Sequence, residues 1–400
     1  RRKIAAEGLN ECITYSFIDQ KSAEKFGSDF ELVKLSNPIS SEMSHMRPSL
    51  LPGLCQATYR NQSRSNNDIK IFEIGEVEYQ WNDDEYIRPE VKDLIIYEMH
   101  IGDFIGIEGE IGTYETIIEK INSGYFAELG INAIELMPIM EFEGDYSWGY
   151  NTSFAMAPET TYGTPEELKE FIDIAHQNNI AILLDVVYNH LWGSSPLFQL
   201  YQPLDNYEWD SHNFDDCPYF DDEESLWGYK IEHWHNINGR NYRGWKYVED
   251  ALLYWVNEYH IDGYRFDYVE GIGWDGDYNG ASYYANMLDN IDPSLILIAE
   301  ADNSYQINNT DFDSGWDYSY HHNLFDNILD IYFNVDNILN HINAYSQGYG
   351  FVTGPVNYIE SHDESRLIYQ STEFQNHSLE EAYKRSKIGA SILFTSHGVP

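Results

Sequence analysis

Short apolar runs alternate with longer amphipathic segments over most of the chain. From residue 94 onward the runs are nearly continuous in Ile, Leu, Val and Tyr, which predicts strands buried on both faces, as in a parallel sheet between helical layers. A weaker strand is predicted near Ser314–Tyr320. The seven clear ones are Leu94–Met99, Ala133–Met137, Ala181–Val187, Asp262–Asp267, Leu295–Glu300, Val356–Ser361 and Ser391–Thr395.

The segments between these strands repeat apolar residues every three to four positions, which predicts helices at 113–130, 164–179 and 248–260. The first two begin with Thr at the N-cap position, and Pro165 occupies the first helical position of the second. Eight alternating units predict a (β/α)8 barrel. A doubly wound open sheet is the alternative, but no Gly-rich phosphate motif follows the first strand.

Two non-periodic segments are expected to stand over the carboxyl end of this barrel. Residues 142–151 (FEGDYSWGYN) follow the second strand, and residues 191–244 follow the third. The longer segment is rich in Asp, Asn, Trp and Tyr. Loops of this length are usually functional or disordered, so we expect a small subdomain there.

The first 80 residues follow a different pattern. They predict a strand at Glu11–Ile18, a helix after Pro52 and a strand at Lys70–Gly75. They contain 10 basic and 11 acidic residues, whereas residues 81–400 contain 13 basic and 56 acidic. This change indicates a segment at 1–79, a junction at 80–93 and a second domain at 94–400.

The acidic excess disfavours nucleic acid or an anionic membrane as a partner of the second domain, because phosphates would be repelled. The 33 Tyr and 10 Trp suit flat, uncharged ligands such as sugars, although the same residues also pack cores. Three Cys without CxxC spacing predict free thiols. The sequence has no membrane-length apolar run and no signal-peptide pattern, which slightly favours a cytoplasmic location. Because the chain begins at Arg1 without Met, we expect it to be a fragment. The oligomeric state stays open.

Acidic and basic side chains gather at the predicted strand ends. In a barrel these ends converge on one face, although the residues lie far apart in sequence. Each acid alone is more often a surface or capping group, and one Arg–Asp pair is more often structural. The whole set favours an active site: Asp185, Asn189, His190, Arg265, Asp267, Glu300, His362 and Asp363.

Glycoside hydrolysis with retention needs one carboxylate that attacks the anomeric carbon and one carboxylic acid that protonates the leaving oxygen. We expect Arg265 to hold Asp267 ionised as the nucleophile, and Glu300 to be the acid of higher pKa. Asp363 would stabilise the positive charge of the transition state. His190 and His362 would donate hydrogen bonds to sugar hydroxyls.

The motifs DVVYNH, GYRFD, IAE and ESHD resemble, in order, four signature regions of glycoside hydrolase family 13, the alpha-amylase family, over about residues 92–400. The resemblance implies action on α-1,4-glucans. Asp267 would be nucleophile, Glu300 general acid/base and Asp363 transition-state stabiliser. The remaining implied roles are substrate contacts by Tyr150, His190, Arg265 and His362, and support of Arg265 by Asp185.

The segment 134–151 is most similar to the branch that holds glucan branching enzymes and trehalohydrolases. IAEAD favours the trehalohydrolases and SHDE the branching enzymes, so the subtype stays open. Asn189 is a calcium ligand in many amylases, and Asp275–Gly280 (DGDYNG) begins like a calcium loop, but its twelfth position is Asn286. We expect no cofactor, with calcium as the open alternative. Because the chain stops at SHGVP, we expect a barrel truncated at its eighth unit and weakly stable.

Residues 1–79 resemble part of the phenylalanyl-tRNA synthetase beta subunit, through GLNECITYSFID, LSNPISSEMSHMRPSLLPGL, NQSR and IFEIGEVEY. The corresponding domain does not activate amino acids in that family, so the resemblance implies no active site. We interpret the partial α+β segment as a rearranged joining. Two other functions were weighed: a synthetase component that binds tRNA or an alpha subunit, which would need a basic surface, and an inactive carbohydrate-binding barrel, which the acidic trio disfavours.

Overall fold

A computed structural model describes residues 8–400 except 27–31, 67, 75–78, 83–84, 107–108, 202–216, 226, 238, 277–278 and 332–333. The chain divides into two compact units, Arg1–Gln80 and Trp81–Pro400. Within the described ranges, none of the helices has the length and hydropathy that a membrane span would need.

The first unit is a small α+β arrangement. Strand β1 (Asn10–Glu11) pairs in parallel with β4 (Ile71–Phe72), and β2 (Phe17–Ile18) pairs antiparallel with β3 (His45–Met46). The predicted strand at 11–18 is therefore wrong as one element, because each of its ends pairs with a different partner. The predicted helix after Pro52 is confirmed. The helices of this unit are α2 (Gln20–Phe26), η1 (Ser41–Met43) and α3 (Leu51–Gln62).

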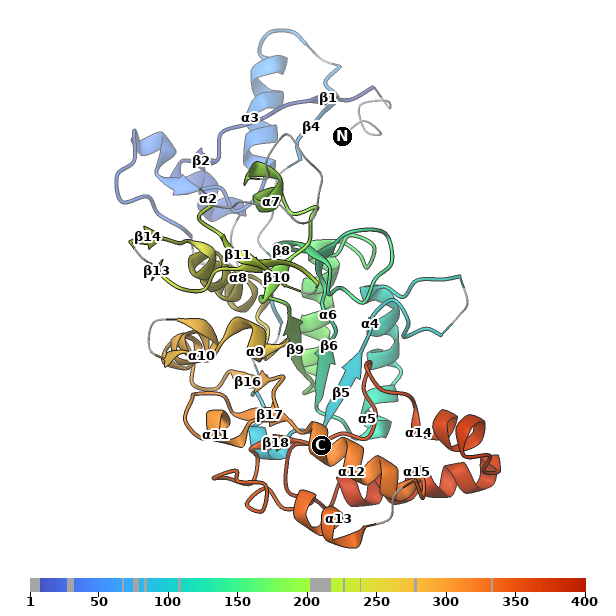
Figure 1. Cartoon of the computed structure of the whole chain (residues 1–400). Coiled ribbons are helices and arrows are strands. Elements are labelled where there is room, and N and C mark those ends of the chain that lie inside the picture. The colour runs from blue at the N-terminus through green and yellow to red at the C-terminus, as the bar shows by residue number, and fades with distance from the viewer. Residues whose placement is uncertain are drawn as a thin grey trace. The chain divides into compact units, whose positions relative to one another are not determined.

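The second unit is built on a parallel sheet that curls through neighbouring strands (Figure 1). The predicted strands are confirmed within one to three residues at their ends, apart from the sixth, which is much shorter, and the last. The weak strand near Ser314 is β17. In spatial order the strands are β5 (Ile96–Met99), β6 (Ala133–Leu136), β9 (Ala181–Val186), β15 (Gly263–Phe266), β16 (Ile296–Ala299), β17 (Ser314–Trp316) and β18 (Pro355–Val356).

The last two residues of the chain occupy the eighth position of this ring. Val399 forms a parallel bridge with Val356. The Val399 amide donates to the Pro355 carbonyl at 2.9 Å, and the Pro400 carbonyl accepts from the Ile96 amide at 2.8 Å. The predicted strand at 391–395 is wrong. Its apolar residues belong mainly to helix α15 (Leu379–Leu393), whose inner face packs against a buried cluster on α12 (Tyr318–Ile328).

Helices surround the sheet as the apolar periodicity predicts. Thr113 and Thr164 cap α4 (Tyr114–Asn122) and α6 (Pro165–Gln177), each accepting a hydrogen bond from the amide three residues on. The expected helix 113–130 is two helices, because Gly124 adopts φ +81° between α4 and α5 (Tyr125–Leu129). The others are α8 (Gly244–Tyr259), α9 (Val269–Ile272), α10 (Gly280–Ile291), α11 (Ser304–Ile307), α13 (Val335–His341), α14 (Leu367–Tyr369), a π-helical turn η4 (Gln370–Phe374) and a 3₁₀ turn η2 (Val91–Asp93).

The two expected loop regions carry short antiparallel sheets. Segment 142–151 lies between β7 (Met140–Phe142) and β8 (Thr152–Pro158), which pair with each other. The segment that follows β9 holds a three-stranded sheet and a hairpin, and residues 202–216 lie outside the described residues. Its elements are β10 (His190–Leu191), α7 (Pro196–Tyr201), β11 (Phe220–Ser225), β12 (Gly228–Ile231), β13 (Asn236–Ile237) and β14 (Arg240–Asn241).

Residues of each strand point alternately into the ring and toward the helices. In β9, Leu183 belongs to a cluster shared with residues of β16, β17 and β18, whereas Leu184 and Val186 pack in the large cluster shared with the helices. The same alternation places Asp185 inside the ring, two residues after Leu183. Polar groups inside the ring therefore lie near the carboxyl ends of the strands.

Candidate active site

Arg265 lies at the centre of the polar cluster inside the ring. Its side chain is fully buried, and Nη1 lies 2.9 Å from both carboxylate oxygens of Asp185, its partner in the pairing of β15 with β9. Nη1 also lies 3.0 Å from Asp267 Oδ1, and Nη2 lies 3.1 Å from Glu300 Oε1. The guanidinium stacks over Trp316, with Cζ 4.3 Å from the ring centre. One cation thus joins three carboxyl groups from three strands.

Asp267 and Glu300 lie on the same rim and interact with each other beside the two terminal nitrogens of Arg265. Asn189 Nδ2 donates to Asp267 Oδ2 at 2.9 Å, which orients the carboxyl group. Tyr318 donates its hydroxyl to Glu300 Oε1 at 2.7 Å, and the Tyr268 amide donates to Oε2. Two carboxyl groups close together on one rim are what a retaining two-carboxylate mechanism requires.

The order of the two pKa values is the reverse of the expected one. Burial raises the pKa of Asp267 well above its ordinary value, and Arg265 only partly offsets this. Burial also acts on Glu300, but Arg265 and the hydrogen bonds from Tyr268 and Tyr318 outweigh it, so the pKa of Glu300 is lowered. The expectation failed because one donor is a backbone amide in the turn after β15, and the other is a hydroxyl at the start of α12, where the sequence predicted a weak strand. Of the two carboxyl groups, Asp267 therefore holds a proton more readily in the free site.

His362 is held by Glu98, a residue that was not among those predicted from the sequence. Glu98 on β5 accepts from the His362 amide at 2.8 Å and contacts Nδ1 at 2.7 Å. Burial lowers the pKa of His362, but the hydrogen bond and charge of Glu98 outweigh it, so the pKa is raised. The signal was a charged residue inside a buried strand. Glu135, paired with Glu98 across β6, is also buried, and burial raises its pKa well above the usual range.

Tyr150 links the Arg265 cluster to His362. Its hydroxyl donates to Asp185 Oδ2 at 2.6 Å and lies 2.9 Å from His362 Nε2, and its ring stacks on the imidazole with centroids 5.2 Å apart. These contacts fix the ring at the base of the site.

His190 does not occupy the place expected of a hydroxyl donor. Its buried Nε2 donates to the Tyr150 carbonyl at 2.9 Å, and Nδ1 faces Asn189 Oδ1. Burial lowers its pKa to about 4. Both ring nitrogens therefore contact protein atoms, and His190 positions Asn189 and Tyr150.

The three predicted acids differ in exposure. The side chain of Asp363 is 54% exposed, whereas those of Asp267 and Glu300 are 15% and 13% exposed. Asp363 follows β18, and its Oδ1 lies 3.4 Å from His362 Nε2. The pair is thus partly enclosed, and the third acid stands at the solvent side of the same rim.

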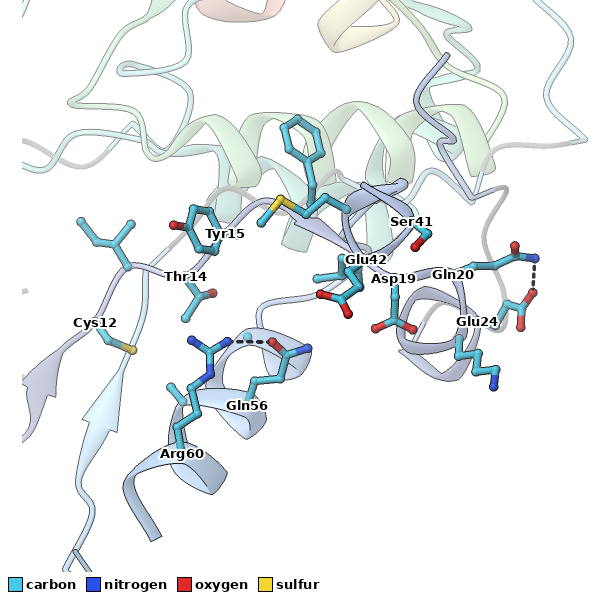
Figure 2. Close-up of a pocket in the computed structure, with 17 residues that line it drawn as sticks. Cys12, Thr14, Tyr15, Asp19, Gln20, Glu24, Ser41, Glu42, Gln56 and Arg60 are labelled. Carbon is cyan, nitrogen blue, oxygen red and sulfur yellow. Dashed lines mark hydrogen bonds between the residues drawn. The ribbon is translucent and has the colours of Figure 1, made fainter. Parts of the chain in front are cut away.

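A separate cavity of about 920 Å³ lies in the first unit (Figure 2). Its lining includes Thr14, Asp19 and Glu42, and Arg60 donates to Gln56 at 3.2 Å across one wall. All of its lining residues fall within 1–80, so it contains none of the predicted catalytic residues.

Calcium at Asn189 or at Asp275–Gly280 stays a prediction. Asn189 has both ends of its amide turned to Asp267 and His190. In the segment Asp275–Gly280, residues 277–278 lie outside the described residues.

Two family models match the chain. The alpha amylase catalytic domain matches residues 64–400, and the phenylalanyl tRNA synthetase beta chain CLM domain matches residues 1–99. The two matches overlap at 64–99. Each of the two resemblances seen in the sequence is thereby confirmed.

Curated relatives include trehalohydrolases and branching enzymes. Malto-oligosyltrehalose trehalohydrolase of Saccharolobus solfataricus is 34% identical over 201 residues, which is 50% of this chain and 32% of that protein. The corresponding enzyme of Deinococcus radiodurans is 29% identical over 59% of this chain and 35% of its own length. A 1,4-alpha-glucan branching enzyme of Picrophilus torridus is 32% identical over 48% of this chain and 25% of its own. The chain thus spans about a third or less of these relatives.

Solved structures share the fold. A pullulanase of Anoxybacillus, solved in complex with maltotriose, aligns with a TM-score of 0.61 at 24% identity. The alignment covers 83% of this chain and 52% of the pullulanase chain. An Anoxybacillus alpha-amylase aligns with a TM-score of 0.60 at 19% identity and covers 78% and 70%.

Proposed function

The chain belongs to the alpha-amylase catalytic domain family, and we propose that it acts on α-1,4-glucans as a retaining glycoside hydrolase or transglycosylase. The observation that carries this proposal is that Asp267 and Glu300 both contact the buried Arg265 guanidinium, at 3.0 and 3.1 Å. Retention requires two carboxyl groups about 5–5.5 Å apart, one ionised as nucleophile and one protonated as acid. The structural likeness to a pullulanase solved with maltotriose supports the same fold.

The interaction between the two carboxyl groups reconciles the pKa order with this mechanism. Two coupled carboxyl groups titrate as a pair, and the reaction needs the pair to hold one proton. When a glycosidic oxygen approaches Glu300, the proton moves to that carboxyl group, and Asp267 becomes the ionised partner beside Arg265. The Nη1 contact at 3.0 Å stabilises the negative charge that then lies on Asp267.

The bond changes balance across two steps. In the first, Asp267 Oδ attacks the anomeric carbon, the bond from that carbon to the leaving oxygen breaks, and Glu300 gives its proton to that oxygen. In the second, Glu300 takes a proton from an acceptor hydroxyl, which displaces Asp267 from the glycosyl ester. The carboxylate of Asp363, more open than the pair, would face the positive charge on the sugar ring.

The acceptor decides the finer activity. Water would give hydrolysis, and a glucan 6-hydroxyl would give branching. The relatives include both trehalohydrolases and branching enzymes. Incubation with amylose separates the outcomes: a rise in reducing ends indicates hydrolysis, and a shift of the iodine spectrum without that rise indicates branching. Release of trehalose from a maltooligosyl trehalose indicates a trehalohydrolase.

Paired variants test the assignment of the two carboxyl groups. Glu300→Gln should lower turnover of a maltooligosaccharide by about 100- to 10,000-fold, the usual contribution of general acid catalysis. It should retain the first step on an α-maltosyl fluoride, because fluoride leaves without a proton. Asp267→Asn should lose activity on both substrates. Equal loss of both substrates in Glu300→Gln would contradict its role as acid, and an inactive wild type would favour a carbohydrate-binding barrel.

A further inference from the structure

Two histidines of helix α12 face the carboxylate of Glu364. His321 Nε2 lies 3.5 Å from Glu364 Oε2, and His322 Nε2 lies 4.0 Å from Oε1. One ligand atom from each of the three side chains lies within 4.8 Å of the others. Glu364 is on the segment after β18, so the cluster joins two parts of the second unit.

These spacings are too long for hydrogen bonds, whose N to O distances are about 2.7–3.2 Å. His321 is 1% exposed, and its Nε2 is directed at the Glu364 carboxylate. An imidazole nitrogen at this spacing from a carboxylate oxygen can offer a lone pair to a cation held between them.

The His321 ring is fixed in this orientation by its neighbours. It stacks on Tyr358 with centroids 5.1 Å apart and an interplanar angle of 14°, and Phe325 packs beside it. The backbone carbonyls of Tyr358 and Ile359 interact with the imidazole, although Nδ1 forms no hydrogen bond of ordinary geometry within the described residues. The packed ring therefore keeps Nε2 directed at Glu364.

We propose that His321, His322 and Glu364 bind a zinc ion. Two imidazoles and one carboxylate form a common zinc set, with water in the fourth position. Zinc bonds of about 2.0–2.2 Å in a tetrahedron place ligand atoms about 3.3 Å apart. The 3.5 Å spacing is close to this value, and His322, 64% exposed at the surface, can move the remaining distance. Calcium fits poorly, because it takes six to eight oxygen ligands.

The ion would brace the proposed active site. Glu364 directly follows Asp363, and α12 begins at Tyr318, which donates to Glu300. Zinc therefore connects the loop that carries Asp363 to the helix that holds Glu300. This consequence rests on the proposed function, whereas the binding of zinc does not.

Zinc binding is measured on the 400-residue chain after treatment with a chelator, by titration calorimetry with zinc chloride, followed by zinc X-ray absorption. The expected result is one zinc per chain with nitrogen and oxygen ligands. Replacement of a residue that only supports a metal ligand typically weakens metal binding by about 10- to 100-fold. His322→Ala and Glu364→Gln remove ligands themselves, so each should weaken zinc binding by more than that. These two side chains are at least partly exposed, so the variants avoid the folding defect that replacement of the buried His321 could cause.

His377→Ala and Glu373→Gln are the matched controls, because both residues lie outside the cluster, and they should bind zinc as the wild type does. The proposal is overturned if the wild type binds no zinc, if it binds zinc with oxygen ligands only, or if His322→Ala and Glu364→Gln bind it unchanged.

Activity on amylose is then compared with and without zinc. Removal of the ion should lower kcat, by up to about 100-fold if Asp363 moves by about 1 Å, with a smaller change in KM. Zinc binding without any glucan activity in the wild type would refute the proposed function and leave the metal site standing. Activity that is independent of zinc would refute the brace.

Discussion

Asp185→Asn tests whether the ion pair inside the ring is as buried and as closely matched as the structure describes. Asp185 supplies two of the carboxylate contacts to Arg265, both at 2.9 Å, and both side chains are almost fully inaccessible to water. The amide is nearly the same size, so the substitution removes charge without opening a cavity. It also removes one acceptor of the Tyr150 hydroxyl, or forces the amide to turn.

The expected loss of stability follows from these contacts. Removal of one partner of a buried pair costs about 3–5 kcal/mol. We expect the lower value, about 3 kcal/mol, because the negative charge shared by Asp267 and Glu300 still faces Arg265. For a unit of residues 81–400, the unfolding entropy corresponds to about 0.7 kcal/mol per degree, so the Tm should fall by about 4–5 °C.

Thermal unfolding followed by near-ultraviolet circular dichroism measures this change, since most of the Tyr and Trp lie in the second unit. Asp363→Asn is the matched control: it makes the same chemical change on the same rim at a half-exposed position, and its Tm should move by less than about 1 °C. If Asp185→Asn also shifts the Tm by less than 1 °C, the ion pair is hydrated and the described burial is wrong.

Two further changes address the first strand and the sheet. The pKa of His362 is raised in the folded state, so its ion pair with Glu98 contributes stability that is complete below pH 6.5 and is lost as the pH rises through the folded value. Glu98→Gln should flatten this decline of the unfolding free energy in denaturant titrations from pH 6 to 9. An unchanged slope would contradict this role of the ion pair. Gly263→Ala would place a Cβ 2.0 Å from the Ile296 carbonyl oxygen, a backbone atom that cannot move aside. We therefore expect the free energy of unfolding to fall by at least about 3 kcal/mol. Gly193→Ala, whose Cβ would have its nearest contact at 3.6 Å, should leave it nearly unchanged.

The ends of the strands could be predicted because their residues repeat a simple pattern. An apolar run that stops at an acidic or basic residue marks both the strand and its place on the rim, as at Asp185, Asp267 and Glu300. The last predicted strand failed because a short apolar run fits a buried helix equally well, and the contacts of α15 with α12 decided the outcome. A run of five residues is too short for apolar periodicity to distinguish a strand from a helix.

The electrostatic order inside the site could not be predicted from strand ends alone. It depends on the Tyr268 amide and the Tyr318 hydroxyl, which approach Glu300 from a turn and from the start of α12. Glu98 was missed for a related reason, because a carboxylate in the middle of a strand becomes informative only when its partner, His362, is known from the distant loop. The contact between Glu98 and His362 joins residues separated by 264 positions.

The hydrogen bonds of Val399 and Pro400 that close the ring of strands affect how the second unit folds. Ile96 meets Pro400 across nearly the whole length of that unit, and Val399 meets Val356 on the other side. Contacts of such long range are slow to form, because the chain between them must lose its freedom before they stabilise anything. On a ribosome the ring could not shut until the residues at positions 399 and 400 had left the exit tunnel, so earlier nascent chains would carry two unpaired strand edges and depend on chaperones.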